Sequence, residues 1–398
     1  MKILITSDWN DQAVNGVATS VKNLRRELEL LGHEVRVLTL SQSHRSWVSG
    51  GTTYLGSMPV GRIYPGARLR TALAGSFVRD IVAWGPDIVH SQCEFSTFFL
   101  ARRIADELSI PLVHTYHTVY EDYTHYFSPS VRLGKKAVAT LSRFISERTD
   151  AMIVPTDKVR RLLLKYGVCV PIHVVPSGID LRRFSRETEP ETLTKQRADL
   201  GIPADRTILV NVGRLAEEKN LEELLRFRAH MEGQNITLLL VGGGPWRSHL
   251  EETAAELGLA APDVVFAGMV PPDTVADWYR MGDLFVSAST SETQGLTYAE
   301  ALAAGVPALC RADECLEGVI LEGENGWQYR TEAEFRARLE EFLTHPERRA
   351  AMRASALQVA QEYSAETFGK RVEAIYQDLI RRRRKAKAAN ETEYKSMF

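Results

Sequence analysis

The sequence is poor in cysteine and has almost no net charge. Its 398 residues include four cysteines, none in a CxxC pair, and all four lie in or beside apolar stretches. This pattern indicates reduced core thiols in a cytoplasmic chain and makes metal binding by cysteine improbable. The formal net charge is −2, which argues against a generally cationic nucleic-acid binder.

Long apolar runs and common phosphate motifs are also missing. No run approaches 18 apolar residues, so the sequence predicts no membrane-spanning helix. Met1 to Thr6 is too short for the apolar region of a signal peptide and predicts a buried first strand. Walker A and Asp-x-Asp sequences are absent, and Gly242 to Pro245 lacks GxGxxG spacing. We therefore expect no tightly bound cofactor and no metal site, with Mg²⁺ at most a non-essential activator.

Short β-rich runs alternate with helical patterns along the chain, which is typical of a parallel α/β architecture. The first half predicts strands at 2–6, 34–40, 88–90, 112–115 and 151–155, with a helix at 19–31. The second half predicts strands at 207–213, 236–241, 264–267, 284–287 and 307–310.

This length exceeds what one hydrophobic core usually supports, so we predict two Rossmann-like domains facing across a cleft. The expected domains are 1–182 and 183–368. The charged stretch Arg182 to Asp205 is the best candidate for an interdomain linker. Ligands of open α/β sheets bind beyond the carboxyl ends of the strands, so the site should lie in the loops there.

The most informative of these loops contains two glutamates, Glu292 and Glu300, on either side of Gly295. A turn that ends a strand and opens a helix offers free N–H groups to an anion, and nearby carboxylates accept hydrogen bonds from sugar hydroxyls. The segment therefore suits a phosphorylated sugar. The competing interpretation is an acid that stabilises the helix dipole and a second, exposed helical acid.

Two further loops carry groups suited to phosphate. Arg214 and Lys219 follow a predicted strand and lie five residues apart, so they could neutralise a diphosphate from two directions. Gly16 opens the first helix and permits close backbone approach to a ligand. Solvated surface charges and an ordinary strand-to-helix turn are the alternatives.

These segments together resemble the family 4 retaining glycosyltransferases, which have the GT-B fold. The resemblance covers nearly the whole chain and rests on four motifs: Gly213-Arg-x4-Lys219, Glu292-x7-Glu300-Ala-x-Ala-x-Gly305-x-Pro307, Asn325-Gly326, and Val175-Pro-Ser-Gly178-Ile-Asp180. It implies transfer of a sugar from a nucleotide-sugar donor with retention of anomeric configuration. It further implies that domain 1–182 holds the acceptor and contacts the membrane, and that domain 183–368 binds the nucleotide sugar. The C-terminal helix, about 369–398, is expected to pack back on the first domain.

The resemblance also implies roles for individual residues. It implies that Arg214 and Lys219 bind the diphosphate of the donor, that Glu300 binds the ribose hydroxyls and that Glu292 binds the hydroxyls of the donor sugar. Backbone groups of Gln294, Gly295 and Leu296 would complete the binding of sugar and phosphate, and Gly16 would face the phosphate from the other domain. Gln294 replaces a bulky residue often found there, which leaves the donor sugar less defined. No enzymic nucleophile is evident, so we favour front-side attack in which the leaving phosphate takes the acceptor proton. Double displacement through Glu292 is the minor alternative.

The acceptor side is expected in the segment Thr115 to Phe127, which resembles the His-Thr-x-Tyr-x-Asp-Tyr sequence of bacterial diacylglycerol glucosyltransferases in this family. That resemblance implies that His117 contacts the donor sugar and the catalytic centre. It also implies that Tyr120, Asp122 and Tyr123 shape the acceptor site. Taken singly, each could equally be a structural residue.

We therefore expect an enzyme that transfers glucose from UDP-glucose to the 3-hydroxyl of 1,2-diacylglycerol, giving alpha-monoglucosyldiacylglycerol. The alternatives are a related transferase acting on another lipid, such as phosphatidylinositol with a mannose donor, or on a soluble sugar. A non-catalytic nucleotide-sugar binder is disfavoured because it need not keep the sugar-side carboxylate. A dinucleotide oxidoreductase is disfavoured because the first strand lacks the glycine fingerprint.

Two basic segments suggest peripheral attachment to the inner face of the cell membrane. Val131 to Phe144 interleaves apolar residues with lysine and arginine, and Arg381 to Lys387 is a dense basic run. A basic amphipathic helix can lie on an anionic bilayer, each charge contributing about 1 kcal/mol near the surface. Solvated helix faces are the alternative explanation for both segments.

Overall fold

All ten strands predicted above are confirmed in the computed structural model, which describes residues 1–398 except 14, 61–67, 72–74, 122–129, 187 and 397–398. The chain forms two units. Unit 1 is Met1–Gly178 with Ala365–Phe398, and unit 2 is Ile179–Ser364. The divisions thus lie at 178/179 and 364/365, where the sequence suggested 182/183 and 368/369.

In the described part of unit 1 an eight-stranded sheet has the order β10-β9-β8-β7-β1-β2-β4-β3, in which β3 alone is antiparallel to its neighbour. A separate hairpin pairs β5 with β6. The strand bounds are β1 Lys2–Ser7, β2 Glu34–Leu40, β3 Trp47–Ser49, β4 Thr52–Leu55, β5 Ser57–Pro59, β6 Arg68–Arg70, β7 Ile88–Ser91, β8 Leu112–Thr115, β9 Ala151–Val154 and β10 Ile172–Val174.

Helices cover both faces of this sheet, because successive residues of a strand point to opposite sides. Ile3 and Ile5 of β1 pack in one apolar cluster with α1 and α14, whereas Leu4 packs in another with α2 and α3. The helix bounds are α1 Gly16–Leu30, α2 Gly75–Trp84, α3 Ser96–Leu108, α4 Val131–Ser146, α5 Asp157–Lys165 and α14 Ala365–Ser396.

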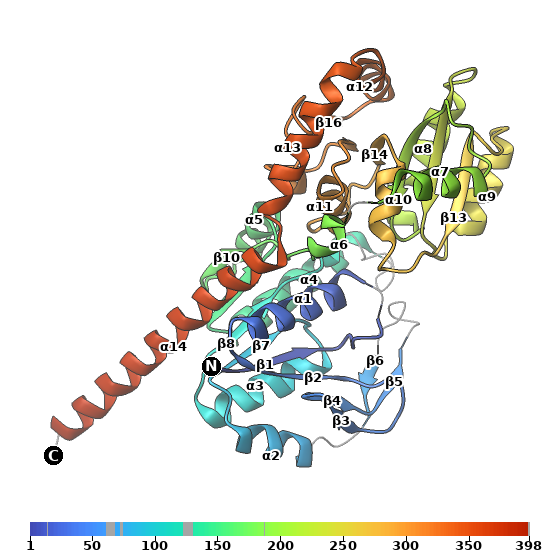
Figure 1. Ribbon diagram of the computed structural model, residues 1–398. Helices are drawn as coiled ribbons and strands as arrows, with labels where there is room; N and C mark the ends of the chain where they lie inside the picture. Colours follow the sequence, from blue (N-terminus) through green and yellow to red (C-terminus); the bar gives the residue numbers. More distant parts are fainter. Residues whose placement is uncertain (14, 61–67, 72–74, 122–129, 187, 397–398) are drawn as a thin grey trace. The chain divides into compact units, whose positions relative to one another are not determined.

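The last helix, α14, returns to unit 1 and lies beside α1 (Figure 1). A Cβ at Gly369 would stand 2.7 Å from Cβ of Glu27, so glycine allows the two helices to approach closely. Phe368, Val372 and Tyr376 of α14 join the same apolar cluster as Ile3. The helix is therefore part of the core of unit 1.

Unit 2 contains a six-stranded parallel sheet in its described residues, with the order β13-β12-β11-β14-β15-β16. Its strands are buried on both faces, as expected for parallel strands covered by helices. The strand bounds are β11 Thr207–Val212, β12 Ile236–Val241, β13 Val264–Gly268, β14 Leu284–Ser287, β15 Ala308–Arg311 and β16 Gly326–Tyr329. The helices are α6 Arg182–Ser185, α7 Pro190–Asp199, α8 Leu221–Ala229, α9 Arg247–Glu256, α10 Val275–Met281, α11 Leu296–Ala303, α12 Glu332–Thr344 and α13 Arg349–Gln361, with 3₁₀ turns at Glu217–Lys219, Glu314–Leu316 and Pro346–Arg348.

One sequence prediction about the fold is wrong. The stretch Arg182 to Asp205 is not a linker, because it forms α6 and α7 and lies inside unit 2. Arg280 of α10 holds it there, donating hydrogen bonds to the backbone oxygens of Phe184 and Arg186. Four charged residues of the stretch, Glu191, Lys195, Arg197 and Asp199, lie on α7, which has no buried residue.

Candidate active site

In unit 2, the predicted donor-binding residues follow two neighbouring strands. β11 pairs directly with β14, so the loops that leave their carboxyl ends start side by side. The first loop runs from Gly213 to the 3₁₀ turn that ends at Lys219, and the second leads to α11. Ser291 of the second loop donates a hydrogen bond to the backbone oxygen of Glu218 at 3.1 Å.

The pairing of strands brings Lys219 and Glu292 together, although 72 residues separate them in the sequence. The Lys219 Nζ lies 2.5 Å from Oε1 of Glu292, and the two side chains are 28% and 14% exposed. The pair is thus partly shielded from water but still reachable by a ligand. The pair joins the loop after β11 to the loop before α11.

Arg214 lies in the same loop with a different partner. Its guanidinium pairs with Glu218, four residues further along, and its side chain is 41% exposed. Arg214 therefore has to exchange part of this pairing to reach a phosphate. Lys219 is already tied to the second loop, so we regard it as the better positioned cation of the two.

The turn before α11 requires glycine. Gly295 has φ of +73°, and a Cβ there would lie 2.2 Å from Cε2 of the buried Tyr298. No side chain caps α11 at this position, so the first N–H groups of the helix have no side-chain partner at Gly295. Leu296 is the first residue of the helix, and Gln294 is buried beside it at 8% exposed.

Glu300 is not the exposed helical acid of the alternative interpretation. The hydroxyl of Tyr279, on α10, donates to its Oε2 at 2.7 Å. Burial raises the pKa of Glu300, while this hydrogen bond and the charge of Arg183 oppose the rise. The sequence analysis missed Tyr279, because nothing in its local pattern distinguishes it from a core tyrosine.

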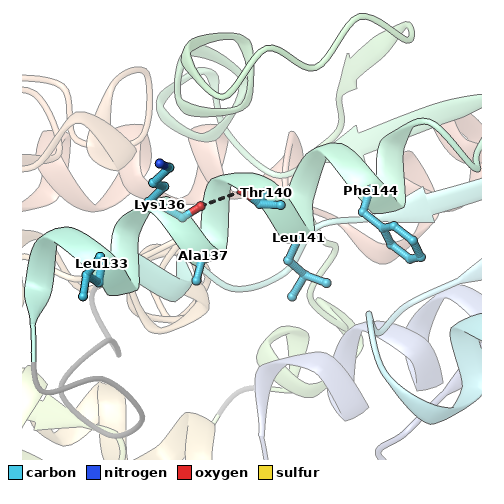
Figure 2. A pocket seen from close by; sticks show the side chains of 6 residues that line it. All are labelled: Leu133, Lys136, Ala137, Thr140, Leu141 and Phe144. Atoms are coloured by element: carbon cyan, nitrogen blue, oxygen red, sulfur yellow. Dashed lines mark hydrogen bonds between the residues drawn. The ribbon is translucent and has the colours of Figure 1, made fainter.

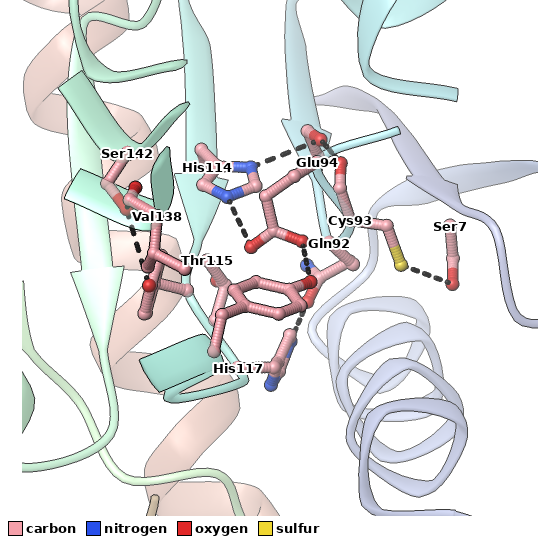
Figure 3. A network of polar contacts seen from close by, with 12 residues as sticks. Ser7, Gln92, Cys93, Glu94, His114, Thr115, His117, Val138 and Ser142 are labelled. Carbon is pink, nitrogen blue, oxygen red and sulfur yellow. Dashed lines mark hydrogen bonds and ion pairs between the residues drawn. The ribbon is translucent and has the colours of Figure 1, made fainter. Parts of the chain in front are cut away.

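In unit 1, polar side chains gather at the carboxyl ends of β1, β7 and β8, which are neighbours in the sheet (Figure 3). His117 follows β8, and its Nε2 lies 2.7 Å from Oε1 of Gln92, which follows β7. The Tyr120 hydroxyl donates to Oε2 of Glu94 at 2.5 Å. Oε1 of the same carboxylate lies 3.3 Å from Nε2 of His114.

Burial sets the protonation of this cluster. It lowers the pKa of His117 to about 4; the nearby His114 adds to the effect and Glu94 opposes it. Burial and the charge of Glu94 raise the pKa of Tyr120 well above its usual value. At neutral pH His117 is therefore an uncharged imidazole, and Tyr120 stays protonated and donates a hydrogen bond to Glu94.

The structure also places Asp8, which the sequence analysis did not select, in this cluster. Its Oδ1 accepts a hydrogen bond from the Thr97 N–H at 2.8 Å, and its buried Oδ2 has no partner in the described part of the chain. Burial is the main cause that raises the pKa of Asp8 to about 6, and the charge of Glu94 contributes. Ionised Asp8 therefore destabilises the folded state, which is a common property of functional residues.

We expect the Asp8→Asn variant to be more stable than the wild type at pH 7.5 and about equal to it near pH 4. A carboxyl group whose pKa is raised by folding does not destabilise the folded state at pH values below its unfolded pKa of 3.8. Its full destabilising effect is reached at pH values above its folded pKa. The gain should grow between about pH 4 and 6, reaching at most about 3 kcal/mol. Thermal unfolding at several pH values measures it. A gain that is constant across this range would contradict the assignment.

The other predicted residues of unit 1 are placed as follows. Gly16 is the first residue of α1, and Asn15 caps the helix by accepting from the Ala18 N–H at 2.9 Å. Asp122 and Tyr123 lie outside the described residues. Among the residues that are described, no group of three or more His, Cys, Asp or Glu side chains could hold a metal ion.

Models of glycosyltransferase families match both halves of the chain. Residues 14–183 match the family model Glycosyltransferase Family 4, and residues 193–359 match Glycosyl transferases group 1. The alpha-monoglucosyldiacylglycerol synthase of Streptococcus pneumoniae is 36% identical over 96% of this chain and 86% of its own length. The synthase of the same name from Acholeplasma laidlawii is 30% identical over 96% of this chain and 98% of its own.

Solved structures share the fold. The structure of HepE from Anabaena, in complex with UDP, has a TM-score of 0.73 and 18% sequence identity, covering 95% of this chain and all of its own. The two α/β units with parallel sheets therefore form a GT-B fold, as predicted. The chain belongs to glycosyltransferase family 4 and is a glycosyltransferase whose relatives include enzymes of glycolipid synthesis.

Proposed function

We propose that this enzyme transfers glucose from UDP-glucose to the 3-hydroxyl of 1,2-diacylglycerol with retention, giving alpha-monoglucosyldiacylglycerol. The observation that carries the proposal is the similarity to two alpha-monoglucosyldiacylglycerol synthases over 96% of the chain. It spans the donor loops of unit 2 and the buried polar cluster of unit 1. A related transferase acting on another lipid or on a soluble sugar is the alternative outcome of the test below.

We assign the donor to unit 2. The Lys219 ammonium, with Arg214, would neutralise the diphosphate, and the free N–H groups at the start of α11 would add further donors. Glu292, held by Lys219, would accept hydrogen bonds from the sugar, and Glu300, held by Tyr279, from the ribose. The UDP complex of HepE, which shares this fold, supports a uridine nucleotide as the donor.

The chemistry follows from the charges that develop. As the bond to the sugar breaks, negative charge grows on the leaving phosphate and positive charge on the sugar ring. Lys219 stabilises the first, and a neutral His117 adds no positive charge near the second. In front-side attack the acceptor hydroxyl bonds to the anomeric carbon as the bond from that carbon to the phosphate oxygen breaks. The departing phosphate takes the hydroxyl proton.

The acceptor proposal is supported by an apolar face on α4. Figure 2 shows six side chains along this helix that line a groove: Leu133, Lys136, Ala137, Thr140, Leu141 and Phe144. Leu133 is 65% exposed, and Phe144 contacts Phe99, which is 55% exposed on α3. In the described residues no helix is long and apolar enough to cross a bilayer. We propose that this face, flanked by basic side chains, rests on an anionic membrane surface.

The basic run on α14 supports this role less well. Arg383 and Arg384 lie 3.8 and 3.9 Å from Asp150 and Asp87, which immediately precede β9 and β7. The run therefore lies at the amino ends of the strands, whereas His117 lies at the carboxyl ends. We assign the membrane contact to α4 alone.

We expect the double variant Leu133→Asp, Lys136→Glu to bind vesicles containing anionic lipid at least about 10-fold more weakly. Leu133→Asp would place a negative charge on the apolar face that contacts the membrane, and Lys136→Glu would replace a positive charge with a negative one. Activity on a short-chain, water-soluble diacylglycerol should be retained. Vesicle co-sedimentation measures binding, and Leu357→Asp on α13 is the matched control, since Leu357 is also exposed. Equal binding by the double variant and the control would contradict the assignment.

The proposed function is tested by offering radiolabelled UDP-glucose with three acceptors in mixed micelles: diacylglycerol, phosphatidylinositol and a soluble sugar. We expect label to enter the lipid phase with diacylglycerol alone. Transfer to one of the other acceptors would move the assignment to the alternative. UDP-galactose and GDP-mannose are offered as alternative donors, and we expect the enzyme to transfer sugar from neither.

A further inference from the structure

We infer that Gln92 is a positioning residue: it holds His117 as the tautomer with its proton on Nε2, so that the Nδ1 lone pair accepts a hydrogen bond from a substrate hydroxyl. This inference rests on the proposed function, which places His117 at the donor sugar. It adds a residue that the sequence analysis did not select.

The geometry of Gln92 leaves it little freedom. It directly follows β7 and is 1% exposed, and its backbone N–H donates to the Thr6 oxygen at 2.8 Å. Its side-chain oxygen, Oε1, lies 2.7 Å from Nε2 of His117. In this amide orientation the oxygen accepts the hydrogen bond, so Nε2 carries the proton. A neutral ring then has its lone pair on Nδ1.

The surroundings of His117 keep the ring neutral. Its pKa is lowered to about 4, chiefly by burial; His114 lowers it further and Glu94 raises it. A third titratable neighbour is His90, whose own pKa is lowered by burial, His114 and His117. Glu94 is already engaged by Tyr120 and His114. Gln92 is therefore the neighbour that decides which ring nitrogen is protonated, and Glu94 does not compete for that position.

The side-chain nitrogen of Gln92, at the other end of the same amide, is in an unfavourable environment. The side-chain nitrogen of Gln92 is buried and has no hydrogen-bond partner in the described part of the chain. A buried donor without a partner destabilises the folded state, which a purely structural residue would avoid. The opposite amide orientation would place that nitrogen against His117 and force the proton onto Nδ1. The two orientations of the Gln92 amide therefore predict opposite tautomers of His117.

The direct test is ¹⁵N NMR of the full-length protein labelled at histidine, with the His117 signals assigned by their loss in His117→Gln. We expect a protonated Nε2 and an unprotonated Nδ1 in the wild type from pH 5.5 to 8. A proton on Nδ1 would overturn the inference. This measurement needs no activity and no variant of Gln92, so it is decisive even if such variants fold poorly.

Kinetics test the positioning role separately. Gln92→Met should populate both tautomers, and Gln92→Glu should favour the imidazolium and make His117 titrate near neutral pH. We expect both to lower kcat about 10-fold or more, with the KM for diacylglycerol nearly unchanged, and Gln92→Glu to recover activity as pH rises. Wild-type kcat in both folded variants would overturn the positioning role. An inactive wild type towards every glucose acceptor would instead refute the proposed function.

Discussion

Replacing Lys219 with alanine is expected to lower kcat by about 10²–10³-fold, the usual effect of removing one group that stabilises developing charge. The ammonium is the cation that the structure fixes between the two donor loops. Its loss also removes a positive charge that lies beside Glu292. Steady-state kinetics with UDP-glucose measure the effect, and thermal unfolding checks that the fold is intact.

Two variants serve as controls for Lys219. Lys219→Arg keeps the charge and should retain more activity than the alanine variant. Arg214→Ala should cost less, because Arg214 is more exposed and pairs with Glu218. Unchanged turnover in Lys219→Ala, or a larger loss in Arg214→Ala, would contradict our ranking of the two cations.

Replacing Glu300 with alanine is expected to raise the KM for UDP-glucose by about 10–100-fold, since a hydrogen bond to a charged group contributes about 1.5–3 kcal/mol. The change in kcat should be smaller, because the ribose is remote from the reacting bond. The matched control is Tyr279→Phe, which removes only the hydroxyl that holds the carboxylate. It should show a partial effect in the same direction.

Isothermal titration with UDP, which contains the ribose but no sugar, separates binding from catalysis in these variants. Weaker UDP binding by Glu300→Ala and near-normal binding by Glu292→Ala would support the assignments of ribose and sugar. The reverse pattern would exchange the two roles.

The strands were predictable because parallel strands are buried on both faces and appear in the sequence as short apolar runs. The runs at Ile236 to Val241 and Leu284 to Ser287 are examples, and both are buried throughout. Short strands at edges were missed. β3 is fully exposed and β10 only half-buried, so neither has an apolar run.

The contacts described at the candidate site follow from the sequence only where the residues lie in one loop or one motif. The pairing of Lys219 with Glu292 depends on β11 lying next to β14, which the order of strands in the sequence does not reveal. Gln92 and Glu94 were missed for the same reason, since their role requires β7 and β8 to be neighbours. Tyr279 reaches Glu300 from another helix, a contact set by tertiary packing.

The most direct test of the account is the structure of the product formed from UDP-glucose labelled with ¹³C at the anomeric carbon and unlabelled diacylglycerol. NMR of the purified lipid reports the donor sugar, the glycerol carbon that carries it and the anomeric configuration together. We predict an α-linked glucose on the 3-oxygen of the glycerol. A β linkage would contradict the retaining mechanism, and labelled glucose found only in water would contradict the lipid acceptor.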